Sequence, residues 1–186
     1  MADAEPKGRS KAAKAKVVAG GVKMHPGRPK GFSGFRPGTP SKRTVEEILG
    51  GSTVLHHRLE RPMDAHKLLK DGIPANALRF MVSHVNLLQN EKNFTIALGM
   101  SARTFQRKKS DDAKKLSREQ SGRAWKFAEV LAKAIEVFGS QDDAEEWLQK
   151  PALALDGRTP VELLETTAGA EMVETLLTRI DYGVYT

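Results

Sequence analysis

The sequence contains no cysteine, which excludes disulfide cross-links and thiolate metal sites. It also has no apolar run approaching the roughly 18 residues that a membrane-spanning helix needs. The N-terminus is basic, but no apolar stretch follows it as in a secretory signal. These absences favour a cytoplasmic protein without a membrane segment. A hydrophobic content of 39% over 186 residues suits one or two small domains.

The sequence also lacks the common signatures of an enzyme. It has no P-loop, no G-x-G-x-x-G motif and no Ser/His/Asp pattern in a nucleophile context. His56 and His57 are adjacent, so on a helix they point about 100° apart and are unsuited to chelating one metal. Four acids are interpreted as surface charge that matches a helix dipole rather than as catalytic carboxylates: Asp142, Asp143, Glu145 and Glu146. The sequence predicts no enzyme activity, no cofactor and no metal.

Charge is distributed unevenly along the chain. Residues 1–43 carry a net charge of +9, residues 44–87 carry 0, residues 88–123 carry +5 and residues 124–186 carry −7. Basic segments attract the phosphates of nucleic acids and release counterions from them. An acidic helical segment does not approach DNA readily and is free to bind a protein. The distribution therefore predicts two kinds of partner.

Residues 1–43 are predicted to be a disordered basic tail. They hold five of the nine prolines and seven of the sixteen glycines and show almost no apolar periodicity. Within them, Pro26-Gly27-Arg28-Pro29-Lys30-Gly31 resembles the core of an AT-hook, which lays an arginine in a narrow minor groove. The usual preceding basic flank is absent, so a purely solubilising tail is the preferred interpretation and a minor-groove contact is the alternative.

The rest of the chain reads as all-α. Thr44 fits the start of a capping box, Asp64 is the expected N-cap of a helix to Lys70, and Ile73-Pro74 opens another helix. Ser117 with Gln120 forms a second capping box that starts a helix to Phe138. Its apolar residues form two adjacent stripes, which predicts burial on more than one side. In a final helix over residues 168–179, the side chains expected to point inward are Met172, Val173, Leu176, Leu177 and Ile180.

Residues 94–109 have the pattern of a helix-turn-helix. Gly99 allows the left-handed backbone of a tight turn, Ser101 is a good N-cap, and Phe105 would hold the second helix to the core. In such motifs the N-terminal part of the second helix enters the major groove, where Arg and Gln read base edges. The predicted DNA-binding residues are Ser101, Arg103, Thr104, Gln106, Arg107 and Lys108.

An ordinary helical hairpin with a basic, solvated face is the alternative interpretation of this segment. The basic residues that continue the segment favour DNA binding: Lys114, Lys115, Arg118 and Arg123.

Three features near the C-terminus carry a resemblance to a known family. They are the Trp147-Leu148 pair, the P-x-x-x-L-x-G-x-T-P turn of residues 151–160 and the ending Tyr182-Gly183-Val184-Tyr185. This pattern, over about residues 125–186, resembles the toxin-binding domain of Xre/ParS-type antitoxins, which pair with RES-domain toxins. The helix-turn-helix at residues 64–116 is compatible with that family and less diagnostic.

The resemblance implies an all-helical protein that dimerises, represses its own operon by binding operator DNA, and neutralises a toxin that consumes NAD. The family's C-terminal end lies against the toxin's active-site cleft. In this sequence that role would fall to Arg158, Arg179, Tyr182, Gly183, Val184 and Tyr185.

The expected organisation is a basic tail (1–43), a helix-turn-helix domain (44–116) and a helical toxin-binding domain (117–186). Two alternatives remain open. One is a stand-alone transcriptional regulator whose C-terminal domain only dimerises. The other is a protein-interaction module whose helix-turn-helix has lost DNA binding.

Overall fold

The computed structural model describes residues 44–56, 58–109 and 114–183, and over these ranges the chain is all-helical, as predicted. In chain order the helices are α1 (Val45–Ile48), α2 (Gly51–Leu55), α3 (Pro62–Asp71), α4 (Ala75–His84), the 3-10 turn η1 (Asn86–Gln89), α5 (Glu91–Leu98), α6 (Ala102–Lys109), α7 (Arg118–Phe138), α8 (Gln141–Leu148), the 3-10 turn η2 (Leu153–Leu155), α9 (Pro160–Leu163) and α10 (Thr167–Asp181). None of the described helices is long and apolar enough to cross a membrane.

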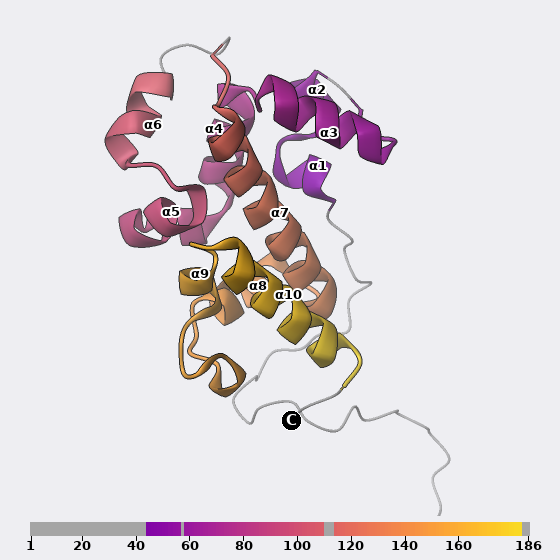
Figure 1. Ribbon diagram of the computed structural model, residues 1–186, viewed down its shortest axis with the longest axis vertical. Helices are drawn as coiled ribbons and strands as arrows, with labels where there is room; N and C mark the ends of the chain where they lie inside the picture. Colours follow the sequence, from indigo (N-terminus) through magenta and orange to yellow (C-terminus); the bar gives the residue numbers. More distant parts are fainter. Residues whose placement is uncertain (1–43, 57, 110–113, 184–186) are drawn as a thin grey trace, which may run out of the picture.

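Helix α7 is the common core of the molecule. It packs against α1, α3 and α5 along one part of its length and against α8 and α10 along another (Figure 1). Its buried residues lie on several sides of the helix: Ser121, Ala124, Phe127, Ala128, Val130, Leu131, Ala134 and Ile135. The prediction of burial on more than one side is confirmed, and both halves of the described chain depend on this helix for their cores.

The predicted capping boxes at Thr44 and Ser117 are both present. The prediction for Asp64 is wrong, because α3 begins two residues earlier, with Arg61 as N-cap and Pro62 at the first position. Asp64 occupies the third helical position and accepts a 3.0 Å hydrogen bond from the backbone N–H of Arg61. The Arg61 guanidinium pairs with the same carboxylate at 3.0 Å and lowers the pKa of Asp64. Because Pro is favoured just inside a helix start, Pro62 was the signal for this boundary.

Glu145 is not a surface charge, contrary to prediction. Glu145 is only 3% exposed, and its Oε2 accepts a 2.7 Å hydrogen bond from the backbone N–H of Leu87 in η1. Gln141, one turn earlier, donates to both Glu145 Oε1 and the carbonyl of His84. The first turn of α8 does carry the expected acids Asp142 and Asp143, with Ser140 as N-cap. Glu145 thus connects α8 to the segment between α4 and α5.

A more exposed pair of contacts also joins the two halves. Lys92 Nζ on α5 lies 2.9 Å from Glu162 Oε1 on α9, and this hydrogen bond lowers the pKa of Glu162. Nearby, Asn93 Nδ2 donates to Gln149 Oε1 at 3.4 Å. Because exposed ion pairs contribute little, the buried Glu145 contact is the stronger connection.

The inward face of α10 follows the predicted pattern except at one residue. Val173 and Leu177 are fully buried, and Leu176 and Ile180 are half-buried. Met172 is 48% exposed, so its predicted inward orientation is wrong. Apolar identity alone does not distinguish a residue at the margin of a helical stripe from one inside it.

Replacing Glu145 with alanine is expected to lower the free energy of unfolding by about 1–3 kcal/mol, because the buried N–H of Leu87 loses its acceptor. Urea denaturation measures the loss. Glu146→Ala is the matched control, since that neighbour is exposed and contacts only Lys150 among the described ion pairs. It should change stability by less than about 0.5 kcal/mol. Equal effects of the two variants would contradict the assignment.

Candidate functional site

The two helices and the turn predicted for residues 94–109 form, and the first helix begins three residues earlier, at Glu91. Gly99 ends α5 with a left-handed backbone (φ 62°), and Ser101 Oγ accepts a 3.3 Å hydrogen bond from the N–H of Thr104 at the start of α6. Phe105 is 8% exposed and its ring centroid lies 5.3 Å from that of Phe94 on α5. These contacts fix the direction in which α6 leaves the core.

Three of the six predicted DNA-binding side chains lie on the outer face of α6. Arg103, Gln106 and Arg107 are exposed. The hydroxyls of Ser101 and Thr104 lie 3.1 Å apart and serve the helix start, so their first role is to cap α6. The side chain of Lys108 lies outside the described residues. The structure therefore brings three candidate base-reading side chains onto one surface.

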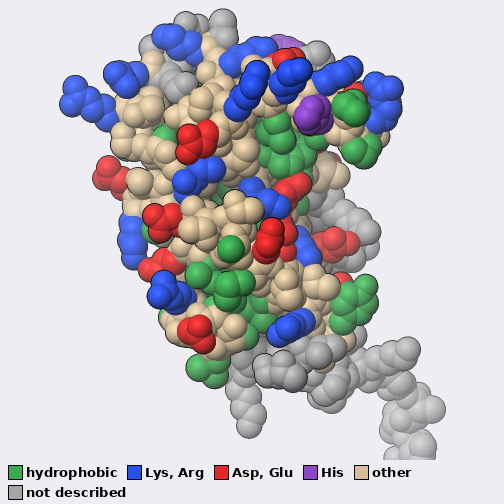
Figure 2. Space-filling view, viewed as in Figure 1, with side chains coloured by type: hydrophobic (Ala, Val, Ile, Leu, Met, Phe, Trp, Pro, Cys, Tyr) green, Lys and Arg blue, Asp and Glu red, His purple; other side chains and the backbone are tan. Residues whose placement is uncertain are grey.

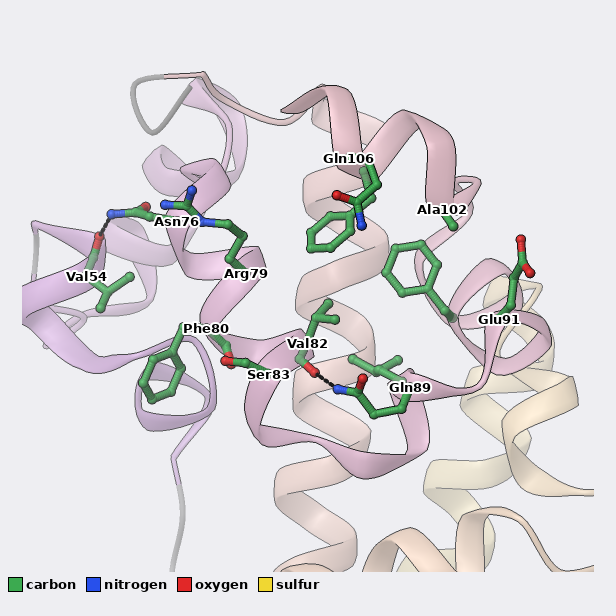
Figure 3. Close-up of a pocket in the computed structure, with 13 residues that line it drawn as sticks. Val54, Asn76, Arg79, Phe80, Val82, Ser83, Gln89, Glu91, Ala102 and Gln106 are labelled. Atoms are coloured by element: carbon green, nitrogen blue, oxygen red, sulfur yellow. Dashed lines mark hydrogen bonds between the residues drawn. The ribbon is translucent and has the colours of Figure 1, made fainter. Parts of the chain in front are cut away.

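A groove lies beside α6. It is formed by α4, α5 and α6, with Arg79 of α4 and Gln106 of α6 on its walls and Phe94 and Phe105 among its apolar lining (Figure 3). Gln89 closes one side by donating a hydrogen bond to the carbonyl of Val82. Phe105 thus anchors α6 and also lines this open groove. The opposite, outer face of α6 is exposed to solvent.

The other group of predicted residues lies in the helices after α7. Arg179 and Tyr182 are exposed at the C-terminal end of α10, with Tyr182 78% exposed, and Gly183 follows with φ 70°. Arg158 is exposed in the loop before α9. Val184 and Tyr185 lie outside the described residues. The end of α10 lies away from α3 and α6, at the opposite end of the molecule (Figure 1).

The loop around η2 displays a residue that sequence reasoning missed. Leu153 is 97% exposed, whereas Leu155 two residues later is buried. A bridge fixes the loop, since the N–H of Ala152 donates to the carbonyl of Arg158 at 3.0 Å, and Asp156 adopts a left-handed backbone (φ 54°). η2 packs against α10. The loop therefore presents a single large apolar side chain to solvent, and the turn signal at residues 151–160 did not show which leucine points outward.

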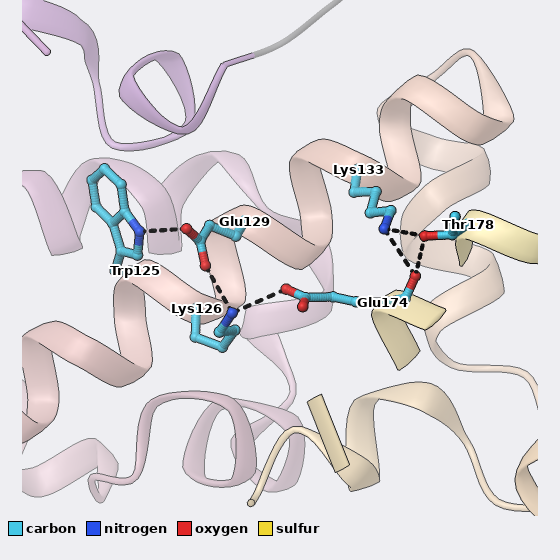
Figure 4. A network of polar contacts seen from close by, with 6 residues as sticks. All are labelled: Trp125, Lys126, Glu129, Lys133, Glu174 and Thr178. Carbon is cyan, nitrogen blue, oxygen red and sulfur yellow. Dashed lines mark hydrogen bonds and ion pairs between the residues drawn. The ribbon is translucent and has the colours of Figure 1, made fainter. Parts of the chain in front are cut away.

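Polar contacts join α7 to α10. Lys126 Nζ lies 3.0 Å from Glu129 Oε2 and 3.1 Å from Glu174 Oε1 of α10, and Trp125 donates to Glu129 (Figure 4). Partial burial acts to lower the pKa of Lys126, but the two carboxylates outweigh it and the pKa is raised. Lys126 therefore stays charged at neutral pH, where it pairs the two helices.

A second lysine continues this network. Lys133 Nζ donates to the carbonyl of Glu174 at 2.9 Å and to the hydroxyl of Thr178, which in turn donates to the same carbonyl (Figure 4). These lysines are therefore engaged within the fold. In the part of the chain that the structure describes, no three His, Cys, Asp or Glu side chains gather as a metal site.

Two protein families match the chain, one for each half. Residues 64–129 match the family described as the antitoxin Xre-like helix-turn-helix domain. Residues 133–183 match the antitoxin Xre/MbcA/ParS C-terminal toxin-binding domain. The two matches meet inside α7, and the second includes Leu153, Arg158, Arg179 and Tyr182.

Curated relatives agree with both matches. Antitoxin Xre of Photorhabdus laumondii is 31% identical over 124 residues, covering 63% of this chain and 78% of that protein. Antitoxin Xre of Pseudomonas putida is 30% identical over 125 residues, covering 67% and 76%. A Sphingobium protein named Prs ADP-ribosylating antitoxin is 29% identical over 133 residues, covering 67% and 82%.

The chain belongs to the Xre antitoxin family. As in that family, a helix-turn-helix domain precedes a C-terminal toxin-binding domain, so the resemblance seen in the sequence is confirmed. The division of charge noted in the sequence, between residues 123 and 124, lies close to the end of the first match.

In this Xre-family chain, Arg123 of α7 packs against the turn between α5 and α6. Its Nη2 donates a 2.7 Å hydrogen bond to the carbonyl of Ile96 in the last turn of α5. The guanidinium also lies against Gly99, where a Cβ atom would come within 2.5 Å of Nε. Arg123, which the sequence grouped with the basic residues available to DNA, is therefore used inside the fold.

Gly99→Ala is expected to destabilise the protein by more than about 1 kcal/mol, because the new Cβ meets both a left-handed backbone and the Arg123 guanidinium. Gly122→Ala is the matched control. Gly122 lies inside α7 with open space around its Cβ position, so alanine there should stabilise by roughly 0.5–1 kcal/mol. Thermal unfolding of both variants tests this; a neutral Gly99→Ala would contradict the contact.

Proposed function

We propose that the chain is the antitoxin of a type II toxin–antitoxin system whose partner is a RES-domain toxin that consumes NAD. The observation that carries the proposal is the toxin-binding family match at residues 133–183. The name of the Sphingobium relative supports NAD as the toxin's substrate, since ADP-ribosyl groups are taken from NAD. The chain itself acts by binding and has no catalytic role.

The toxin-binding surface is proposed to comprise the end of α10, the Tyr182–Tyr185 ending and the η2 loop. Arg158, Arg179 and Tyr182 are exposed there, and Leu153 presents an almost fully exposed apolar side chain. Tyrosine and arginine are enriched at protein interfaces, and the buried core of an interface is more apolar than its rim. The ending would cover the active-site cleft of the toxin.

The DNA-binding surface is proposed to be the outer face of α6, which would enter the major groove of an operator and repress the antitoxin's own operon. Arg103, Gln106 and Arg107 face outward from a helix fixed by Ser101 and Phe105. A homodimer would read two half-sites about 34–36 Å apart. The proposed domains follow the boundaries expected from the sequence, a helix-turn-helix domain over 44–116 and a toxin-binding domain over 117–186.

Truncation of the last six residues is expected to weaken toxin neutralisation while leaving DNA binding unchanged, because α10 ends at the end of the molecule remote from α6 (Figure 1). Leu153→Asp should also weaken neutralisation, since it places a charge in an apolar contact. Growth of cells that co-express the chain with a RES-domain toxin, taken from the neighbouring gene if that gene encodes one, measures both. Met63→Asp is the control, as Met63 on α3 is 57% exposed outside the toxin-binding match. Full protection by the truncated chain would refute the proposed role of the ending.

Arg103→Ala and Gln106→Ala are expected to weaken operator binding, by about 1–3 kcal/mol for a side chain that reads a base pair. The duplex is taken from the region upstream of the chain's own gene, and a scrambled duplex reports non-specific binding. Arg158→Ala removes a comparable exposed arginine outside the helix-turn-helix and should leave operator affinity unchanged. Unchanged affinity in the two α6 variants would favour a helix-turn-helix that has lost DNA binding.

A further inference from the structure

A continuous group of basic side chains crosses the end of the molecule that bears α6. Figure 2 shows Lys and Arg side chains gathered along this end, from α6 across the start of α7 to α3. We call the exposed members of this group the basic band: Lys67, Lys70, Arg103, Arg107, Lys114, Lys115 and Arg118. Only two of the seven lie on α6, so the band extends well beyond the helix-turn-helix.

Backbone contacts hold the α3 part of the band firmly against the start of α7. Arg118 Nε donates to the carbonyl of Lys70 at 3.2 Å. The N–H of Leu116 donates to the carbonyl of Ile73 at 2.9 Å. The N–H of Ile73 donates to the fully buried hydroxyl of Ser121, also at 2.9 Å. Lys70 therefore has a fixed position relative to the segment that follows α6.

The outward face of α3 is cationic. Leu68 points into the core, while Lys67 and Lys70 are exposed one turn apart. Of the two acids in α3, Asp64 is paired with Arg61. Two exposed acids lie in the sequence beside the band, Asp71 at the end of α3 and Glu119 in α7. Both lysines are exposed, and the ion pair described for α3 joins Arg61 to Asp64 and includes neither of them, although Lys67 contributes a weaker coulombic interaction with Asp64.

We propose that α3 is a second DNA-contacting element, in which Lys67 and Lys70 bind backbone phosphates of the same duplex whose major groove receives α6. This rests on the proposed DNA-binding function of α6 and extends it. Phosphate contacts of this kind fix the orientation of a protein on DNA without reading sequence. They also make affinity depend on salt, because each neutralised phosphate releases counterions.

The test measures the affinity of the full chain for an upstream duplex and for a scrambled duplex over a series of salt concentrations. In Lys67→Gln/Lys70→Gln, the slope of log affinity against log salt should fall in magnitude by about 2, one for each lost phosphate contact. Affinity for both duplexes should fall by the same factor. Gln106→Ala should instead lower the preference for the upstream duplex.

Lys150→Gln/Arg179→Gln is the matched control, because it removes two exposed positive charges from the toxin-binding half. Its salt slope should equal that of the unaltered chain. An unaltered slope in the α3 variant, with the unaltered chain still binding DNA, overturns the role of α3 and leaves that of α6 intact. If the unaltered chain binds neither duplex, the DNA-binding function itself is refuted.

Discussion

The burial of α7 on several sides is the constraint on which the rest of the structure depends. Phe127, Leu131 and Ile135 are at most 1% exposed, and helices from both family matches pack around them. Close-packed interiors leave little room for independent movement of the elements that share them. One helix consequently positions both the helix-turn-helix and the helices of the toxin-binding domain. Arg123 of α7 contacts the end of α5, and about one turn and three turns further along α7, Lys126 and Lys133 contact α10.

The two parts of the molecule that α7 joins differ in the sign of their net charge. The basic band and α6 occupy one end, and α10 ends at the other (Figure 1). The acidic residues that follow α7 discourage contact of that half with DNA, so a toxin bound there would not compete directly with phosphates for the same surface. Glu145 and Lys126, by contrast, take little part in this surface pattern because their charges are used between helices.

Local signals predicted most of the fold. Capping residues such as Ser117, the left-handed Gly99 and the stripes of α7 each depend on neighbours within a few residues, and all formed as expected. Apart from the start of α3, where the local signal of Pro62 was missed, the errors arose where distant contacts decide. Glu145 is buried because η1 offers an N–H, and Met172 is exposed because no helix covers that edge of α10 in the described chain. Leu153 could not be distinguished from Leu155 because the orientation of the loop depends on its closing bridge.

The most direct test of the account is co-expression of the chain with the product of the adjacent gene, which the account expects to be a RES-domain protein, followed by size-exclusion chromatography with light scattering. The account predicts one stable complex that contains both proteins, with a mass that gives their ratio. Elution of the chain without the RES-domain protein, when both are expressed and folded, would contradict the proposed toxin partnership and leave a helix-turn-helix regulator whose C-terminal domain has another role.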